Sequence, residues 1–215
     1  EIPLSIEEPE VTTAKLESNL FTTELASYST TGGGSEGRRT NISLAVQSCN
    51  GVILLPGETF SYNDVLGERT ADKGYQPAGA YSDGEVVEQL GGGICQVSST
   101  LFAAVLHTDL EIIPRANHSM PVSYLPMGMD ATVSWGGPEF KFKNNFAYPI
   151  KISASYSGGT ITFKILGAAS DKKKIEVEIK KTGEMGAETY RKYYDENGNV
   201  TSTKRVARSN YKPHS

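Results

Sequence analysis

The hydrophobic pattern of the chain is strongest between residues 94 and 107. The run from Leu101 to Leu106 is apolar almost all round, whereas the residues from Gln96 to Thr100 are largely polar. A helix that is apolar on nearly every side is expected to lie in the middle of a protein. The pattern therefore predicts a buried central helix over 94–107, whose N-terminus is left at a surface or cleft.

The other elements predicted in the first half of the chain are shorter. Apolar residues at helical spacing predict a helix over 39–50, and Gly51 is a suitable C-terminal stop. A segment rich in threonine, serine and tyrosine predicts a strand over 20–31, and the apolar run 52–55 predicts a buried strand. Residues 67–84 are predicted to form a long loop with little regular structure.

The second half of the chain is predicted to be mostly β-structure. Strands are expected over 110–114, 122–125, 131–135, 140–143, 150–156 and 160–166. The last two alternate between apolar and polar residues, so one face of their hairpin should pack and the other should be solvated. The whole pattern predicts an α+β fold, in which the central helix carrying Cys95 packs on an antiparallel sheet.

The C-terminal residues repeat this alternation in a more charged form. Residues 175–179 alternate strictly, and Asn197-Gly198 is a strong turn signal between 190–194 and 200–206. We therefore expect a β-hairpin C-terminal extension over 169–215, which either continues the sheet or forms a small attached module. No candidate catalytic group stands out in it.

Composition and charge narrow the possible functions. With 215 residues, 38% of them apolar, the chain can bury the core of one ordinary domain with a small appendage. A net charge of −4 argues against a nucleic-acid partner. No run approaches the roughly 18 apolar residues of a membrane span. Because the chain begins at Glu1, we expect a fragment or processed form from which any signal or membrane anchor has been removed.

The candidate chemistry centres on Cys95. Three glycines, Gly91-Gly92-Gly93, allow positive φ and let the backbone approach a ligand closely. They lead directly into the predicted central helix. Cys95 then lies in the first turn, where unpaired N–H groups and the helix dipole favour a thiolate and should lower the thiol pKa. This is the environment that a cysteine nucleophile needs.

A thiol nucleophile also needs a base and a group that orients the base. His107 lies too far along the same predicted helix, about 18 Å from Cys95 at about 1.5 Å per residue. We expect His118 to act as the base and Asp130 to hold its tautomer, both from strands beside the helix. The groups expected to bind an oxyanion or substrate are the Cys95 N–H, Gln96, Gln89, Gly93, Asn117 and Tyr124.

Simpler interpretations of these residues stay open. Cys95 can be a small buried residue, His118 can satisfy a bend, and Asp130 can be an ordinary turn residue. Zn²⁺ bound by all three is a further alternative, but no paired metal-ligand spacing supports it. A disulfide between Cys49 and Cys95 is less favoured than a buried, inert Cys49 beside a free Cys95. No cofactor is expected.

Several motifs of the chain carry a family resemblance. They are Arg39 to Ile42, Pro56 to Asn63, Gly91 to Leu101, Asn117 to Ser119, Pro121 to Tyr124 and Phe140 to Asn145. Together they closely resemble the VanW family over roughly residues 36–168, and the long glycine–cysteine motif is highly specific. The family is named from vancomycin-resistance gene clusters and is placed outside the cell, frequently with an N-terminal membrane anchor.

The resemblance implies an extracytoplasmic protein at the cell surface or cell wall of Gram-positive bacteria. Residues 1–35 look like a lead-in from a peptidoglycan-binding-type domain, and residues 169–215 are similar to β modules that follow this domain. We expect a cysteine-dependent amidase or transpeptidase-like enzyme whose partner is peptidoglycan or its peptides. The alternative is a non-catalytic cell-wall binding or scaffolding domain. Membrane contact is expected only through a missing N-terminal anchor, and the oligomeric state is left open.

Overall fold

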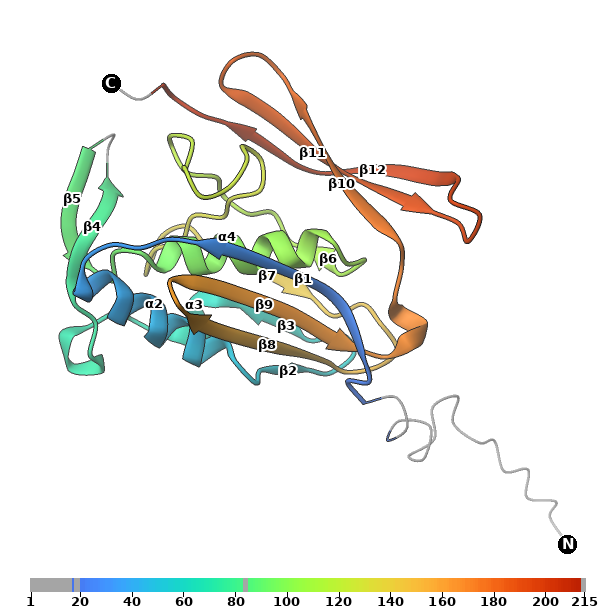
Figure 1. The fold of residues 1–215 in the computed structure, drawn as a ribbon, viewed down its shortest axis with the longest axis horizontal. Coiled ribbons are helices and arrows are strands. Elements are labelled where there is room, and N and C mark those ends of the chain that lie inside the picture. The colour runs from blue at the N-terminus through green and yellow to red at the C-terminus, as the bar shows by residue number, and fades with distance from the viewer. Residues whose placement is uncertain (1–16, 18–19, 83–84, 214–215) are drawn as a thin grey trace, which may run out of the picture.

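The structure is a computed structural model that describes residues 17, 20–82 and 85–213, and it has the predicted α+β fold (Figure 1). The helices of the described residues are α2 (Glu36–Cys49), α3 (Tyr62–Leu66) and α4 (Ile94–Leu106), with 3₁₀ turns η1 (Ala71–Lys73) and η2 (Ala169–Asp171). The strands are β1 (Thr23–Thr31), β2 (Ile53–Leu54), β3 (Thr59–Ser61), β4 (Pro77–Ser82), β5 (Glu85–Leu90), β6 (Glu111–Ile112), β7 (Lys141–Lys143), β8 (Ile150–Ser157), β9 (Thr160–Gly167), β10 (Ile175–Lys181), β11 (Gly186–Tyr194) and β12 (Val200–Asn210).

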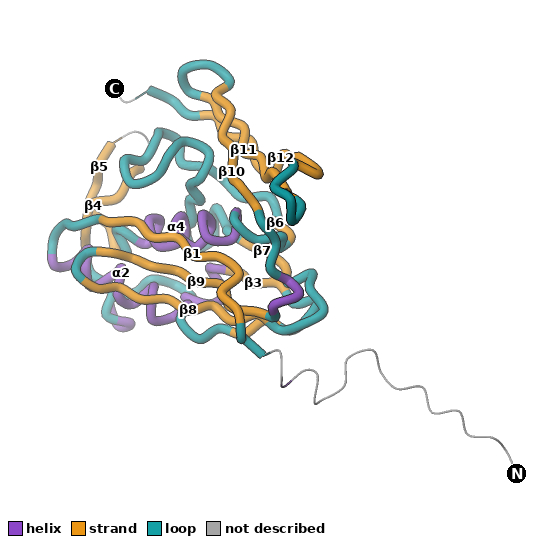
Figure 2. Tube along the Cα trace, turned by 45° about the vertical axis from the view of Figure 1, so that its right-hand side comes forward, coloured by secondary structure: helices purple, strands orange, loops and turns teal. Residues whose placement is uncertain are grey.

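The core forms between an antiparallel sheet and two helices. The sheet has the strand order β1-β9-β8-β2, and α2 and α4 pack against it and against each other (Figure 2). Alternate residues of β9, Ile161, Phe163 and Ile165, are fully buried, as expected for a strand with one packed face. Because β1 belongs to this sheet, residues 23–31 contribute to the core.

Helix α4 is the buried central helix, and its start depends on glycine. Every residue of α4 except Cys95 is buried. Gly93, the N-cap residue, has a φ of 106°, which residues with a Cβ rarely adopt. A Cβ at Gly92 would lie 2.3 Å from the carbonyl oxygen of Ala78 in β4. The glycines therefore fix where α4 begins and let β4 approach that point.

The predicted strands over 122–125 and 131–135 are wrong, because residues 113–140 form no strand. Proline interrupts this segment four times, and proline cannot donate to a strand ladder. Side chains of α4 hold the segment instead. Ser98 Oγ donates to the Ala131 carbonyl at 2.6 Å, and the Ala131 N–H donates to Ser99 Oγ at 3.0 Å.

Two further expectations need correction. Residues 67–84 are not a simple loop, because they contain η1 and the strand β4, which pairs with β5 as an antiparallel hairpin. The run Pro77 to Ala80 has no apolar alternation that would have revealed this strand. The strand predicted over 52–55 shortens to β2, in which Leu54 is buried but Ile53 is 47% exposed.

The C-terminal extension is a separate antiparallel sheet with the order β10-β11-β12, rather than a hairpin alone. The predicted hairpin within it is confirmed, since Tyr193 of β11 lies opposite Ser202 of β12. Most of the predicted lead-in, residues 1–16 and 18–19, lies outside the described residues. Within the described part of the chain, no helix is long and apolar enough to cross a membrane.

Candidate active site

Cys95 opens onto a large cavity beside the start of α4. The cavity has a volume of about 870 Å³ and is lined by Cys95, His118 and Thr132, among other residues. Cys95 Sγ lies 3.4 Å from the Val133 carbonyl oxygen and 3.8 Å from Thr132 Oγ1. Because Cys95 is partly exposed while the rest of its helix is buried, the cavity is where the thiol can meet a ligand.

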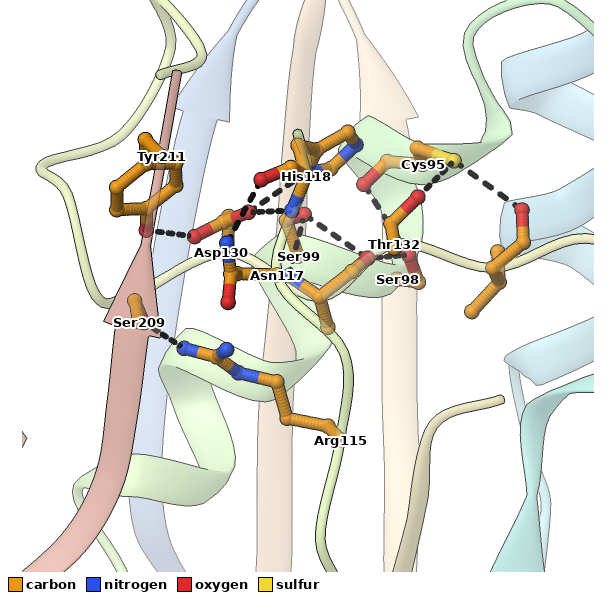
Figure 3. Close-up of polar contacts among 12 residues, drawn as sticks. Cys95, Ser98, Ser99, Arg115, Asn117, His118, Asp130, Thr132, Ser209 and Tyr211 are labelled. Atoms are coloured by element: carbon orange, nitrogen blue, oxygen red, sulfur yellow. Dashed lines mark hydrogen bonds and ion pairs between the residues drawn. The ribbon is translucent and has the colours of Figure 1, made fainter. Parts of the chain in front are cut away.

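His118 and Asp130 come from the irregular segment and contact each other twice. Asp130 Oδ2 accepts hydrogen bonds from the backbone N–H and from Nδ1 of His118, each at 2.7 Å. His118 is 8% exposed and Asp130 is fully buried. Because a carboxylate only accepts, Nδ1 must carry the proton. The other ring nitrogen, Nε2, lies on the side of the imidazole toward Cys95 (Figure 3), and both residues line the same cavity.

A fourth side chain, Tyr211, reaches this group from the end of the C-terminal extension. Its hydroxyl donates to Asp130 Oδ1 and accepts a hydrogen bond from the Gly128 N–H at 2.6 Å. Burial and the Asp130 carboxylate raise the pKa of Tyr211 to about 12, so the phenol stays protonated at neutral pH. In Figure 3, Tyr211, Asp130, His118 and Cys95 follow one another across the site. Tyr211 was missed in the sequence.

The three titratable side chains favour a charged state of the site. Burial raises the pKa of the Cys95 thiol, but His118, together with the Val133 carbonyl and Thr132, outweighs this and the pKa falls below its ordinary value. Burial lowers the pKa of His118, yet Asp130 and Cys95 together raise it to about 9. Burial opposes ionisation of Asp130 too, and the His118 contact still lowers its pKa. These shifts favour the charged form of each side chain, which is a thiolate for Cys95, an imidazolium for His118 and a carboxylate for Asp130.

The two cysteines lie in opposite environments. Gly93 leaves the start of α4 without a side-chain cap, and no acceptor among the described residues takes the Cys95 N–H. The positive end of the helix dipole therefore acts on the thiol. Cys49 ends α2, is fully buried, and has a pKa that burial raises. Neither cysteine is in a disulfide, as expected.

Four of the five other residues predicted to bind substrate or an oxyanion line the cavity: Gln89, Gly93, Gln96 and Tyr124. Asn117 is not among the lining residues, because its Nδ2 donates to the carbonyls of His118 and Asn210, each at 2.7 Å. The Gln96 side chain is already engaged, since its Nε2 donates to Thr30 Oγ1 at 3.1 Å. The Cys95 N–H is therefore the best placed of the predicted oxyanion donors.

Two cationic lining residues, Arg38 and Arg69, were missed in the sequence, whereas Trp135 was expected in the core or the wall of a cleft. Arg38 did offer a signal, because it follows a glycine run at the start of a helix and has no acidic residue four positions away to pair with. Trp135 is 51% exposed. Within the described ranges, no three His, Cys, Asp or Glu side chains lie close enough together to hold a metal ion.

Fold and site define a class of protein: an α+β domain in which a partly exposed cysteine at the start of a buried helix meets a histidine held by an aspartate. The sequence profile described as VanW-like protein matches residues 37–166. The chain belongs to the VanW family. The matched region contains Cys95, His118 and Asp130, and it ends before Tyr211.

Two curated relatives are similar to this chain. The Bacillus subtilis (strain 168) protein named uncharacterized protein YoaR is 44% identical over 165 residues, covering 74% of this chain and 54% of YoaR. The vancomycin B-type resistance protein VanW of Enterococcus faecalis (strain ATCC 700802 / V583) is 35% identical over 135 residues, which cover 59% of this chain and 49% of VanW. The chain thus spans about half the length of these relatives. No solved structure matches it significantly.

Proposed function

We propose that this protein is a cysteine-dependent amidase or acyl transferase that acts on amide bonds of cell-wall peptides. The observation that carries the proposal is the grouping of Cys95, His118 and Asp130 at one cavity, with a lowered thiol pKa and a His118 pKa of about 9. A thiolate beside an imidazolium is a nucleophile at neutral pH, whereas a free thiol with a pKa of about 8.5 is mostly protonated.

In the first step, the Cys95 thiolate attacks the carbonyl carbon of the amide. The C–S bond forms, the carbonyl electron pair moves to oxygen, and the Cys95 N–H at the positive end of α4 stabilises the oxyanion. As the C–N bond breaks, the His118 imidazolium gives its proton to the leaving amine. The products are a thioester on Cys95, a free amine and a neutral imidazole.

In the second step, water or an amine attacks the thioester carbonyl. Neutral His118 takes a proton from the attacking group, the C–S bond breaks, and Cys95 leaves as a thiolate. Attack by water gives hydrolysis, and attack by an amine gives a new amide. Asp130 accepts the Nδ1–H in both steps, which keeps Nε2 directed at the thiol.

The substrate class is proposed from the family and from the size of the site. One relative carries the name of a vancomycin B-type resistance protein, and we extend to this chain a vancomycin-resistance-associated role at the cell envelope, outside the cytoplasm. A cavity of about 870 Å³ lies in the size range of small-molecule sites. A segment of cell-wall peptide is a ligand of suitable size.

A non-catalytic cell-wall binding domain is the second candidate, and Trp135 favours it. This half-exposed indole belongs to the cavity lining together with Tyr124 and Pro138, so it offers an apolar surface to a ligand. The two candidates differ in their need for the thiol. Binding should survive replacement of Cys95, whereas turnover should not.

The test is incubation of the purified protein with muropeptides, followed by mass spectrometry. We expect new products with the wild type and with Cys49→Ala, which removes the other cysteine, and none with Cys95→Ala. Cys95→Ala should unfold at nearly the wild-type temperature, because the thiol faces the cavity. Identical product patterns for wild type and Cys95→Ala would overturn the catalytic proposal, and muropeptide binding by both would support the second candidate.

A further inference from the structure

Arg38 places a guanidinium against the turn that presents Cys95. The residue belongs to the first turn of α2 and lines the cavity. A Cβ built on Gly93 would lie 2.9 Å from Arg38 Cγ and 3.1 Å from Nη1. Because Gly93 immediately precedes α4, the guanidinium lies beside the backbone from which the thiol projects.

A chain of buried hydrogen bonds holds Arg38 in this position. Arg38 Nη2 donates to Gln96 Oε1 at 2.7 Å, and Gln96 Nε2 donates to Thr30 Oγ1 at 3.1 Å. Thr30 Oγ1 in turn lies 2.7 Å from Thr100 Oγ1. Gln96, Thr30 and Thr100 are at most 4% exposed, and buried polar groups are tolerated when they are bonded. The partly exposed end of this chain is Arg38, so the network fixes its orientation.

The positive charge of Arg38 has no counterion within the described ranges. Neither Arg38 nor Arg69, which lines the same cavity, forms an ion pair there. Arg69 is 8% exposed, and its buried Nε has no hydrogen-bond partner in the described part of the chain. The lining carboxylate is that of Glu68, which is exposed. The Cys95 thiolate and the His118 imidazolium in the same lining offset each other, so two guanidinium groups face one carboxylate and an anionic ligand would balance the difference.

We propose that Arg38 binds a carboxylate of the acyl-donor peptide, so that the site selects peptides with a free carboxylate close to the amide that Cys95 attacks. The inference rests on the proposed function, because it names the substrate class of the same site. Gln96 holds Nη2, and no other N–H group of the Arg38 guanidinium has a partner among the described residues. A guanidinium fixed in this way matches the planar geometry of a carboxylate.

The test compares two alkylating reagents that differ in charge, iodoacetate and iodoacetamide. Both react with the same Cys95 thiolate, so the ratio of their rates cancels any change in the thiolate fraction. At low ionic strength, we expect Arg38→Gln to lower the iodoacetate-to-iodoacetamide ratio by about fivefold. Arg39→Gln is the matched control, because Arg39 is exposed on the same helix and bonds to the Gly34 carbonyl. Its ratio should equal that of the wild type.

Two further measurements keep the inference falsifiable. Arg38→Lys retains the charge without the planar fork, so its ratio should lie between those of the wild type and Arg38→Gln. The wild-type ratio should also fall between low salt and about 1 M salt, where charge attraction is screened. The carboxylate site would be overturned if folded Arg38→Gln had the wild-type ratio of iodoacetate to iodoacetamide rates. It would also be overturned if the wild-type ratio did not change with salt concentration. Failure of the proposed function looks different: iodoacetamide would then label Cys95 only near the pKa of a free thiol.

Discussion

The two ends of α4 differ in how the rest of the molecule contacts their unpaired backbone groups. At the C-terminal end, Arg191 of β11 donates to the carbonyls of Val105, Leu106 and Leu110 at 2.9, 3.0 and 2.9 Å. At the N-terminal end, Gly93 provides no side-chain cap and the first turn opens onto the cavity. We call the C-terminal end, whose carbonyls bond to the buried Arg191, the closed end of α4. The N-terminal end, which borders the cavity, is the open end.

This difference means that one end of α4 contributes to stability and the other end contributes to the chemistry of the site. Helix ends leave unpaired carbonyls at one terminus and unpaired N–H groups at the other. Arg191 satisfies carbonyls at the end where a positive charge also suits the helix dipole. The N–H groups of Ile94 and Gln96 donate to the Gly91 and Gly93 carbonyls, but the Cys95 N–H has no acceptor among the described residues, so it can stabilise a thiolate and a developing oxyanion. We therefore expect substitutions at the closed end to change folding and those at the open end to change reactivity.

The largest effect should follow from replacing His118 at the open end. In His118→Gln the thiolate loses its imidazolium partner, so the Cys95 pKa should rise toward that of a free thiol. We expect the rate of iodoacetamide labelling at pH 6 to fall by about 100-fold. Mass spectrometry of labelled Cys95 over time measures this rate.

His107 provides the matched control at the other end of the helix. Its Nδ1 lies 2.8 Å from the Ala103 carbonyl, far from the cavity lining. His107→Gln should label at the wild-type rate. Equal labelling of wild type and His118→Gln at pH 6 would mean that His118 does not activate the thiol, whatever its position.

A substitution at the closed end should lower the stability of the protein. Arg191 is 4% exposed, and Arg191→Met leaves the buried carbonyls of Leu106 and Leu110 without a donor among the described residues, whereas that of Val105 keeps Thr108. We expect the free energy of unfolding in urea to fall by about 3 kcal/mol, with an unchanged pH profile of Cys95 labelling. Lys192→Met is the control on the same strand, because its ion pair with Glu178 is near the surface and contributes little. A shifted labelling profile in Arg191→Met would show that the two ends are coupled.

The open end should also leave a signature in the pH dependence of stability. The pKa of His118 is about 9 in the folded protein and about 6.5 in an unfolded chain. Folding therefore favours the protonated imidazole, so this contribution is full below about pH 6.5 and is lost as the pH rises through about 9. We expect the stability advantage of Cys95→Ala over Cys95→Ala/His118→Gln to shrink in urea titrations as the pH rises through the His118 pKa, because the alanine background removes the opposite contribution of the Cys95 thiol. An advantage that grows with pH would contradict the imidazolium assignment.

The local parts of this site could be predicted from the sequence. The glycine run and the apolar segment after it place Cys95 in the first turn of a buried helix, because both signals act within a few residues. The association of His118 with Asp130 was also expected, although from strands that do not form. Their segment is held by Ser98 and Ser99 rather than by a strand ladder. A single serine in an apolar helix does not indicate which backbone group it will bond.

The long-range parts could not be predicted. Tyr211 contacts Asp130 across 81 positions of the chain, and Arg191 reaches Val105 across 86. Arg191 lies in a charged sheet and Tyr211 directly follows its last strand, and the alternation of this sheet predicts strands but not where the sheet docks. Arg38 meets Gln96 across 58 positions, and only the folded α2–α4 contact brings them together. Contacts of this kind depend on packing rather than on local pattern.

The smallest predicted effect concerns Tyr211, which acts on the open end through Asp130. Its hydroxyl donates to the carboxylate and so weakens the negative potential at His118. In Tyr211→Phe we expect the His118 pKa, followed by NMR of the imidazole, to rise by about 0.5 unit. A purely structural role would instead loosen Asp130 and lower the His118 pKa, so the sign decides between the two. Tyr190→Phe, which removes a partly buried contact with Glu188 away from the site, should leave that pKa unchanged.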